Sequence, residues 1–183
     1  MRKALALDPL SMIIRTNIGW FHYFQRDYAK AEEAYLEVLK LDPGFLPARQ
    51  KLWITYALEG KTEQATSELE NLMRLFGHKQ LLQRVEAAKP ASRYQAAVQG
   101  YTEAGALTPY ERARYLALLG KSPEALRALH EAAAQRSAWM VYLRIEPAFD
   151  ALRSRPEFAD LVRQANIPEL SGKALAKATG SSN

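Results

Sequence analysis

The chain contains no cysteine and no long uninterrupted run of apolar residues. Without cysteine it can form neither a disulfide framework nor a thiolate zinc site. No stretch approaches the roughly 20 apolar residues needed to cross a bilayer, so we expect no membrane association. Residues 1–11 lack the pattern of a signal peptide, because Asp8-Pro9 interrupts the segment that would be apolar. The cytoplasm is therefore the expected compartment by default.

Residues that carry chemistry are also scarce. The only histidines are His22, His78 and His130, and no two of them have the i, i+4 spacing of a helical metal site. Glycine-rich phosphate loops of the GxGxxG or GxxxxGK type are absent. Ser137, His130 and Asp150 have the residue types of a catalytic triad, but no nucleophile elbow precedes any serine. We expect no catalytic residue, no metal, no cofactor and no enzymatic activity.

The charge is positive overall but well mixed. The 183 residues carry a net charge of +5, and 48% of them are hydrophobic, which is enough to bury a real core. Basic residues stand among acidic ones, as where Lys30 lies beside Glu32 and Glu33. Mixed charge of this kind is typical of solvated helix faces, so we expect no direct binding of nucleic acid.

One feature recurs along the chain. Asp8-Pro9 and Asp42-Pro43 lie 34 residues apart, and each closes an apolar run, residues 3–7 and 37–41. A period of this length is typical of a helix pair that buries its apolar face only by stacking on a neighbouring pair. Such stacks form binding surfaces rather than catalytic pockets.

Residues 12–45 show the pattern of one complete unit. Gly19 and Ala31 are small where two helices would cross in near contact, and Tyr28 and Tyr35 would fill the gaps between helices. Asp42-Pro43 ends the second helix, since proline disfavours helical geometry in the residue before it. This unit resembles the tetratricopeptide repeat (TPR) family. The resemblance implies an all-α fold, an α-α superhelix (TPR solenoid) of antiparallel helix pairs.

The period predicts a TPR array over residues 1–137, made of a half repeat 1–11, repeats 12–45 and 46–79, a degenerate pair 80–105 and a repeat 106–137. In the second repeat, Trp53 occupies a position that should be small, so we expect it to spread the helices or to turn into a groove. Gly77 is expected to stop the last helix of that repeat. Thr108-Pro109 opens the final repeat.

Beyond the array the composition changes. An apolar run at residues 139–143 precedes two short helices that each begin at a proline and carry Phe149, Leu152, Phe158 and Leu161. We interpret residues 138–170 as a C-terminal helical cap over the last repeat, because an array end would otherwise expose an apolar face. Residues 171–183 are rich in Ser, Gly, Lys and Ala, which predicts a disordered tail.

The C-terminal part has a resemblance of its own. Residues 115–120, residues 139–143 and the block from Pro147 to Phe158 are similar to the C-terminal TPR region of bacterial multidomain regulators of the winged-helix transcriptional regulator, adenylate cyclase or Ser/Thr kinase type. None of those effector domains is present here. The resemblance implies a protein-protein interaction or sensory scaffold within a larger bacterial signalling or transcription-regulatory protein, of which the chain would be a fragment. The alternative is a self-association module that forms homodimers through the exposed N-terminal half repeat.

In the TPR family, ligands lie along the concave surface made by the first helix of each pair. The positions that correspond in this chain are Thr16, Asn17, Trp20, Tyr23, Phe24, Gln50, Lys51 and Ile54. Trp20, Tyr23 and Phe24 form an aromatic strip that suits an apolar or extended peptide anchor of a protein partner. The alternative is that these rings only pack on the preceding repeat, because repeat helices bury two faces.

Overall fold

The chain folds into helices connected by short turns. The computed structural model describes Asp8, residues 11–105 and residues 107–166. In these residues every regular element is helical. The elements are α2 (Met12–Phe24), α3 (Tyr28–Leu41), α4 (Leu46–Leu58), α5 (Thr62–Leu75), α6 (Lys79–Glu86), α7 (Pro90–Ala104), α8 (Pro109–Leu118), α9 (Ser122–Ala134), η1 (Ala138–Tyr142), η2 (Pro147–Leu152) and α10 (Pro156–Gln164). The predicted all-α solenoid of antiparallel helix pairs is therefore confirmed.

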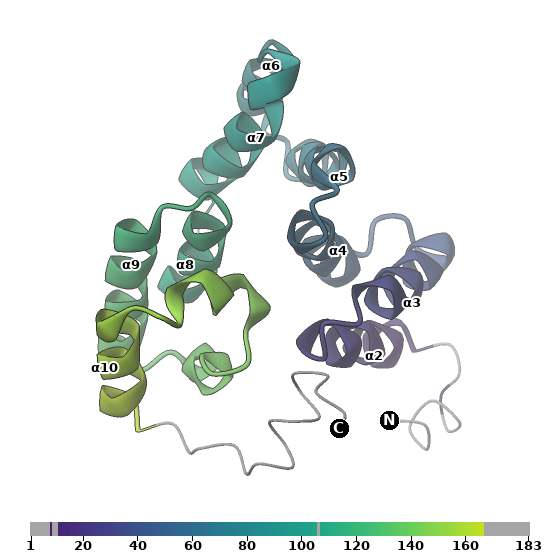
Figure 1. The fold of residues 1–183 in the computed structure, drawn as a ribbon. Helices are drawn as coiled ribbons and strands as arrows, with labels where there is room; N and C mark the ends of the chain where they lie inside the picture. The colour runs from purple at the N-terminus through teal and green to yellow at the C-terminus, as the bar shows by residue number, and fades with distance from the viewer. Residues whose placement is uncertain (1–7, 9–10, 106, 167–183) are drawn as a thin grey trace.

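The helix pairs stack into an arch (Figure 1). One leg of the arch holds α2 and α3, the apex holds α6 and α7, and the other leg holds α8 and α9. The segment made of η1, η2 and α10, which we call the cap, follows α9. Its η1 and η2 part lies between the legs, opposite α2, and α10 lies beside α9 at the foot of that leg. The curvature of the stack thus brings the two ends of the array toward each other.

The close crossing of α2 and α3 follows from the small residues that the sequence places there. A Cβ atom at Gly19 would lie only 2.5 Å from Cε1 of Tyr35, and Tyr35 itself is fully buried. Ala31 is also fully buried in this crossing.

The ends of the helices are likewise determined by residues close by in the sequence. Gly77, the predicted stop after α5, has a φ of +73°, which a residue with a side chain rarely adopts.

Trp53 takes a different place from the one that the sequence suggests. Its side chain is fully buried, and its ring meets that of Tyr115 at a centroid distance of 4.8 Å and an interplanar angle of 64°. Tyr115 belongs to α8, on the other leg of the arch. The indole therefore fills the interior between α4 and α8 instead of facing a groove.

The cap completes a second core with the last helix pair. Phe149, Leu152, Phe158 and Leu161 are buried together with side chains of α8 and α9. Phe149 meets Tyr110 of α8 in an edge-to-face contact, with ring centroids 5.5 Å apart. This packing fixes one face of the cap and leaves its other face turned toward α2.

Two of the predicted segments lie wholly or mostly outside the described residues. They are the half repeat 1–11, of which only Asp8 and Ser11 are described, and the tail 171–183. Within the described residues, no helix is both long enough and apolar enough to span a membrane.

Candidate functional site

The inner side of α2 carries two aromatic residues of the predicted site that lie next to Lys51 of α4. Trp20 and Phe24 are four residues apart on this helix, and their ring centroids lie 5.0 Å apart. Lys51 of α4 places its Nζ atom 5.0 Å from the centre of the Trp20 ring, in a cation-π contact. Both rings are half-buried. The structure thus brings Trp20, Phe24 and Lys51 together on one surface.

The cap contributes two further rings to this surface. Tyr142 stacks on Phe24, with an interplanar angle of 9° and centroids 5.3 Å apart, and lies 4.9 Å from Trp20. Trp139 meets Trp20 edge to face at 5.9 Å and keeps 42% of its surface exposed. We call Trp20, Phe24, Trp139 and Tyr142 the inner aromatic cluster. Half of this cluster comes from residues more than a hundred positions away in the sequence.

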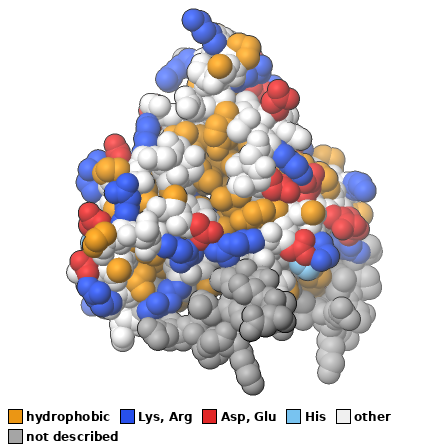
Figure 2. All heavy atoms as spheres, in the orientation of Figure 1, with side chains coloured by type: hydrophobic (Ala, Val, Ile, Leu, Met, Phe, Trp, Pro, Cys, Tyr) orange, Lys and Arg blue, Asp and Glu red, His pale blue; other side chains and the backbone are white. Residues whose placement is uncertain are grey.

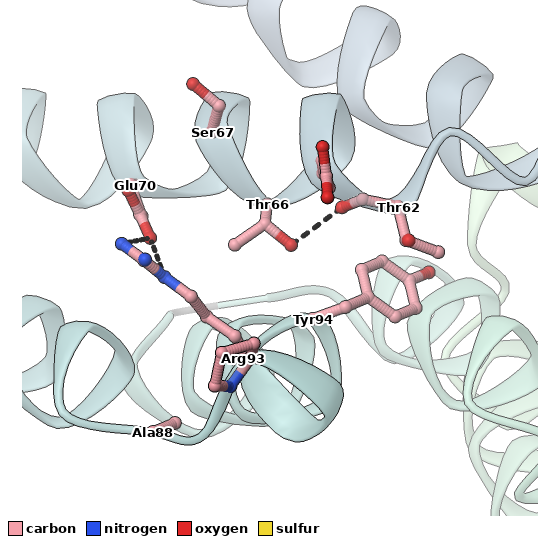
Figure 3. A pocket seen from close by; sticks show the side chains of 9 residues that line it. Thr62, Thr66, Ser67, Glu70, Ala88, Arg93 and Tyr94 are labelled. Atoms are coloured by element: carbon pink, nitrogen blue, oxygen red, sulfur yellow. Dashed lines mark hydrogen bonds and ion pairs between the residues drawn. The ribbon is translucent and has the colours of Figure 1, made fainter.

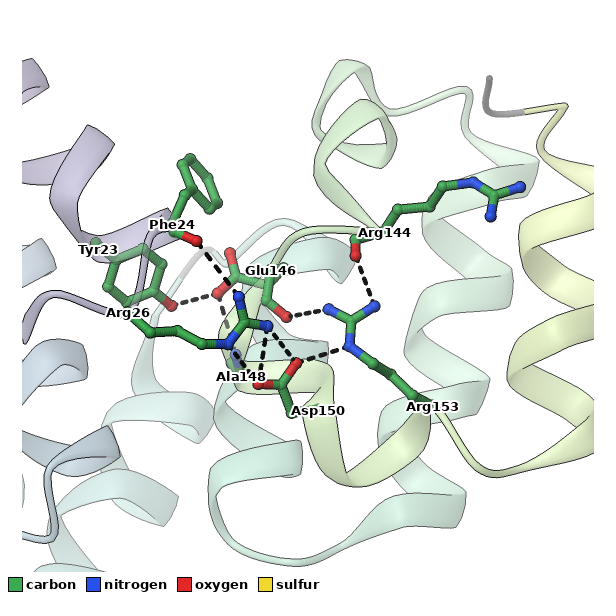
Figure 4. A network of polar contacts seen from close by, with 8 residues as sticks. All are labelled: Tyr23, Phe24, Arg26, Arg144, Glu146, Ala148, Asp150 and Arg153. Atoms are coloured by element: carbon green, nitrogen blue, oxygen red, sulfur yellow. Dashed lines mark hydrogen bonds and ion pairs between the residues drawn. The ribbon is translucent and has the colours of Figure 1, made fainter. Parts of the chain in front are cut away.

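A buried carboxylate lies beside the aromatic cluster. Glu146 of the cap is 1% exposed, and its Oε1 atom accepts hydrogen bonds from the Tyr23 hydroxyl and from the Ala148 amide (Figure 4). Its Oε2 atom lies 3.5 Å from Nη1 of Arg114, on α8. A buried charge requires such partners, because an unpaired carboxylate in the interior is strongly destabilising. Glu146 therefore connects α2 with α8.

A second polar contact joins the C-terminal end of α2 to the cap at a more exposed position. Arg26, which follows α2, donates to both carboxylate oxygens of Asp150, with Nη2 2.8 Å from Oδ1 and Nε 3.1 Å from Oδ2. Arg153 donates to the same carboxylate from the side of the cap, at 2.7 Å (Figure 4). This fork of two parallel hydrogen bonds is directional, but the Asp150 side chain is 42% exposed, so its contribution is screened by water.

Burial shifts the pKa of two groups here. It raises the pKa of Tyr23 well above its ordinary value, and the nearby Glu146 carboxylate raises it further, so the hydroxyl remains a donor. Burial, together with the nearby Arg114 guanidinium, lowers the pKa of Lys51 to about 8. The Lys51 ammonium is thus poorly solvated and would gain from a nearby anion.

The remaining predicted residues have other environments. Thr16 is buried and donates its hydroxyl to the Met12 carbonyl of its own helix at 2.7 Å, and Ile54 is 2% exposed in the core. Gln50 is half-buried and shares a hydrogen bond with Tyr101. Asn17 is exposed instead. The structure therefore does not bring Thr16, Asn17 or Ile54 to the inner aromatic cluster.

Asn17 belongs to a different stripe of α2. Asn17 lies four residues after Ile13 and four before Phe21, which places the three side chains on one face of the helix. Ile13 is 54% exposed and Phe21 is 46% exposed. This stripe is separate from the inner surface.

Several residues of the site were not identified from the sequence. They are Arg26, Arg114, Trp139, Tyr142, Glu146 and Asp150. The apolar run at 139–143 and the Glu146-Pro147 helix start were visible as local signals. Nothing in these local patterns says that they meet α2, because that contact depends on the curvature of the whole stack.

A separate hollow of about 360 Å³ lies between α5 and α7 (Figure 3). Two of its charged side chains pair with each other, since Arg93 lies 2.9 Å from the Glu70 carboxylate through Nε and 2.7 Å from it through Nη2. The Thr66 hydroxyl donates to the Thr62 carbonyl. Glu70, Arg93 and Thr66 are thus already engaged within the protein.

Two other kinds of site are relevant to the described residues, a metal site and a surface of one charge. In the part of the chain that the structure describes, no cluster of three or more His, Asp or Glu side chains could hold a metal ion. Figure 2 shows Lys and Arg side chains interspersed with Asp and Glu around a central band of hydrophobic side chains. A binding surface of mixed character fits this face best.

Comparison with known proteins identifies one repeat. The tetratricopeptide repeat family matches residues 14–45, which include most of α2 and all of α3. No match was found among curated proteins or among solved structures. The comparisons do not support the expected resemblance of the C-terminal block to bacterial multidomain regulators. Repeats of this kind generally serve as scaffolds for protein partners.

Proposed function

We propose that this chain is a protein-interaction scaffold whose inner face binds a peptide segment of a partner protein. The observation that carries the proposal is the joining of Trp20, Phe24 and Lys51 on one half-buried surface of the array. Aromatic side chains in partly desolvated surroundings are the usual anchors of protein interfaces. A cation beside them adds a charge that selects the partner.

In this proposal the predicted residues have unequal roles. Trp20, Phe24 and Lys51 contact the peptide, and Tyr23 and Gln50 supply polar groups next to them. Thr16 and Ile54 support the two helices from the core, since both are buried. Asn17 lies on the exposed stripe and has no part in the inner face.

Selection from a random peptide library tests this proposal. We expect peptides that bind the wild-type chain, and we expect Trp20→Ala to weaken them by more than about 1 kcal/mol, or more than fivefold in Kd, as for a hot-spot residue. Phe76→Ala is the matched control, because Phe76 is an aromatic residue of the α5 terminus that is 46% exposed. Equal losses for the two variants, or no selected peptide at all, would contradict the proposal.

The setting that we propose is a larger bacterial signalling or transcription-regulatory protein in the cytoplasm. It is supported by the resemblance of residues 139–143 and of the block from Pro147 to Phe158. An upstream reading frame that continues into an effector domain is the expected result, and a frame without one would argue against it.

We also propose that this segment does not bind nucleic acid directly, given its mixed charge. Nucleic-acid affinity that falls steeply with salt would show the opposite.

The exposed stripe of α2 favours one further candidate function, self-association. Ile13 and Phe21 are large apolar side chains that are about half exposed at the N-terminal end of the described array. If they pair between chains, sedimentation at tens of micromolar should show a homodimer that Phe21→Ser dissociates and Phe76→Ser does not. A monomer at that concentration removes this candidate.

A further inference from the structure

Three cap residues meet α2 and its C-terminal end at a regular spacing. Tyr142 stacks on Phe24, Glu146 accepts from the Tyr23 hydroxyl, and Asp150 accepts from Arg26. Each of these residues follows the previous one by four positions in the sequence. Together they present one aromatic ring and two carboxylates. The cap thus lies where a peptide ligand of the inner face would lie.

We propose that the cap is a built-in ligand of this face, and that the partner is a peptide with the same chemistry, an aromatic residue followed by carboxylates, which displaces it. This inference rests on the proposed function and names the partner class and the regulation of the same site. The closed chain is then the autoinhibited form, and the partner binds the form in which α2 and the cap are apart.

The cap can leave α2 without losing all partners of its charges. Glu146 keeps the Arg114 guanidinium at 3.5 Å and the Ala148 amide, both on its own side of the contact. Asp150 keeps Arg153 at 2.7 Å. No buried carboxylate is left unpaired when the contact opens, which is the step that would otherwise be most costly.

The backbone geometry also favours release. Side chains span the contact, and in the described residues α2 and the cap segments are not among the pairs of elements with extensive backbone packing. On the side of α2 the cap contributes two 3-10 segments, η1 and η2, which have weaker hydrogen-bond geometry than an α-helix. On its opposite side the cap is anchored by Phe149 and Leu152, both fully buried. The cap can therefore stay folded on α8 and α9 while it separates from α2.

The groups that remain on α2 after the cap leaves determine which peptide can bind there in its place. Release of the cap uncovers the Trp20 and Phe24 rings, the Tyr23 hydroxyl and the face of Arg26 that held Asp150. Lys51 adds an ammonium group that, within the described part of the chain, has no carboxylate oxygen at ion-pair distance. Rings, a hydroxyl donor and two cations are complementary to an aromatic and acidic peptide.

Competition with the cap has a measurable consequence. A ligand that binds only the open form has an apparent Kd equal to its intrinsic Kd divided by the open fraction. A substitution that weakens the contact on the cap side should therefore strengthen peptide binding, although it removes nothing from the binding surface of α2. A purely structural cap contact would not produce this gain.

The experiment uses the full chain and a synthetic peptide of residues 138–153 as the probe. We compare the wild type with Tyr142→Ala, which removes the ring stacked on Phe24, and with Val141→Ala as the matched control, because Val141 is 65% exposed in the same segment. Asp150→Asn is a second, milder opening variant, and a thermal melt checks that each chain is folded. The control peptide carries Gln and Asn in place of its Glu and Asp.

We expect the Kd of the probe to be at least fivefold lower for Tyr142→Ala than for the wild type and for Val141→Ala. Asp150→Asn should shift it in the same direction, and the control peptide should bind every chain at least fivefold more weakly than the probe. The inference is overturned by equal Kd values in all chains, by no binding, or by equal binding of the two peptides. A wild-type dimer with exchanged caps would also overturn it, because the cap would then serve a second copy.

The two proposals fail in different ways. If library peptides bind through Trp20 but lack the aromatic and acidic pattern, and bind the wild type as tightly as Tyr142→Ala, then the scaffold function stands and the inference fails. If no peptide from the library binds either chain, the scaffold function itself fails.

Discussion

At the scale of single residues, Gly19 lies directly against the buried ring of Tyr35. We expect Gly19→Ala to lower the free energy of unfolding by about 1–3 kcal/mol, because the new methyl group would lie 2.5 Å from a fully buried ring. The helix propensity of alanine offsets this loss by up to about 1 kcal/mol. Urea denaturation measures the difference.

Gly100 provides the comparison for this prediction. A Cβ atom at Gly100 would meet the Cδ1 atom of Leu81, the end of a flexible side chain, which can move aside. Gly100→Ala should therefore cost less than Gly19→Ala. The reverse order would show that the crossing of α2 and α3 is looser than the contact with Tyr35 implies.

A second residue with a measurable effect is Lys51. Its pKa is about 8 in the folded chain against 10.5 for the unconstrained group, so the unfolded chain binds more protons between these pH values. The free energy of unfolding should therefore rise with pH in this window, approaching about 1.4 kcal/mol per pH unit. Below pH 8 the Lys51 ammonium is protonated in both the folded and the unfolded chain, so it adds no pH dependence to the free energy of unfolding.

Denaturant unfolding between pH 8 and 9.5 tests the prediction. Lys51→Met should flatten the rise, while Lys79→Met, at an exposed lysine of α6, should keep it. The upper limit avoids the titration of Tyr28, Tyr56 and Tyr94, whose pKa values burial raises to about 12. Those tyrosines lower stability only as pH rises beyond about 10. An unchanged slope in Lys51→Met would contradict the proposed burial of the ammonium group.

At the scale of the helices, α8 begins with a reciprocal cap. The Thr108 hydroxyl accepts from the Glu111 amide at 3.3 Å, and the Glu111 carboxylate accepts from the Thr108 amide at 2.9 Å. We expect Thr108→Ala to lower the free energy of unfolding by about 1 kcal/mol. Lys121, at the same position before α9, makes no side-chain capping bond, so Lys121→Ala should change stability far less. Equal effects in chemical denaturation would mean that the cap contributes nothing.

The helices of the array are also the level that the sequence predicts best. The small residues Gly19 and Ala31, the stop at Gly77 and the start at Thr108-Pro109 act within one helix pair, so their local pattern is sufficient. Trp53 is a residue whose environment the local repeat pattern does not predict. A repeat pattern says that the position should be small, but only the packed stack shows that Tyr115 of α8 leaves room for an indole.

The candidate site was predicted in part for the same reason. Trp20 and Phe24 lie on the face that the repeat pattern assigns to ligands, and the structure places Lys51 beside them. The cap residues that cover them could not be predicted, because small rotations between successive helix pairs add up over the whole array. A change of one such rotation would separate Tyr142 from Phe24 without altering any local motif.

At the scale of the whole molecule, the array is closed by its own end. Glu146 joins α2 to α8, Asp150 joins the cap to Arg26, and the inner aromatic cluster fills the space between them. The two legs of the arch are thus held together by side chains rather than by a further helix. The proposed function and its regulation both depend on this closure and on its reversal by a peptide.

A distance measurement across the closure tests this account most directly. Because the chain has no cysteine, Ala29→Cys in α3 and Ala151→Cys in η2, both at exposed positions near the Arg26–Asp150 contact, can carry a pair of spin labels. Pulsed electron resonance should give one short, narrow distance distribution for the chain alone, and a longer, broader one when Tyr142→Ala is added. A long, broad distribution in the otherwise unaltered chain would contradict the closed array.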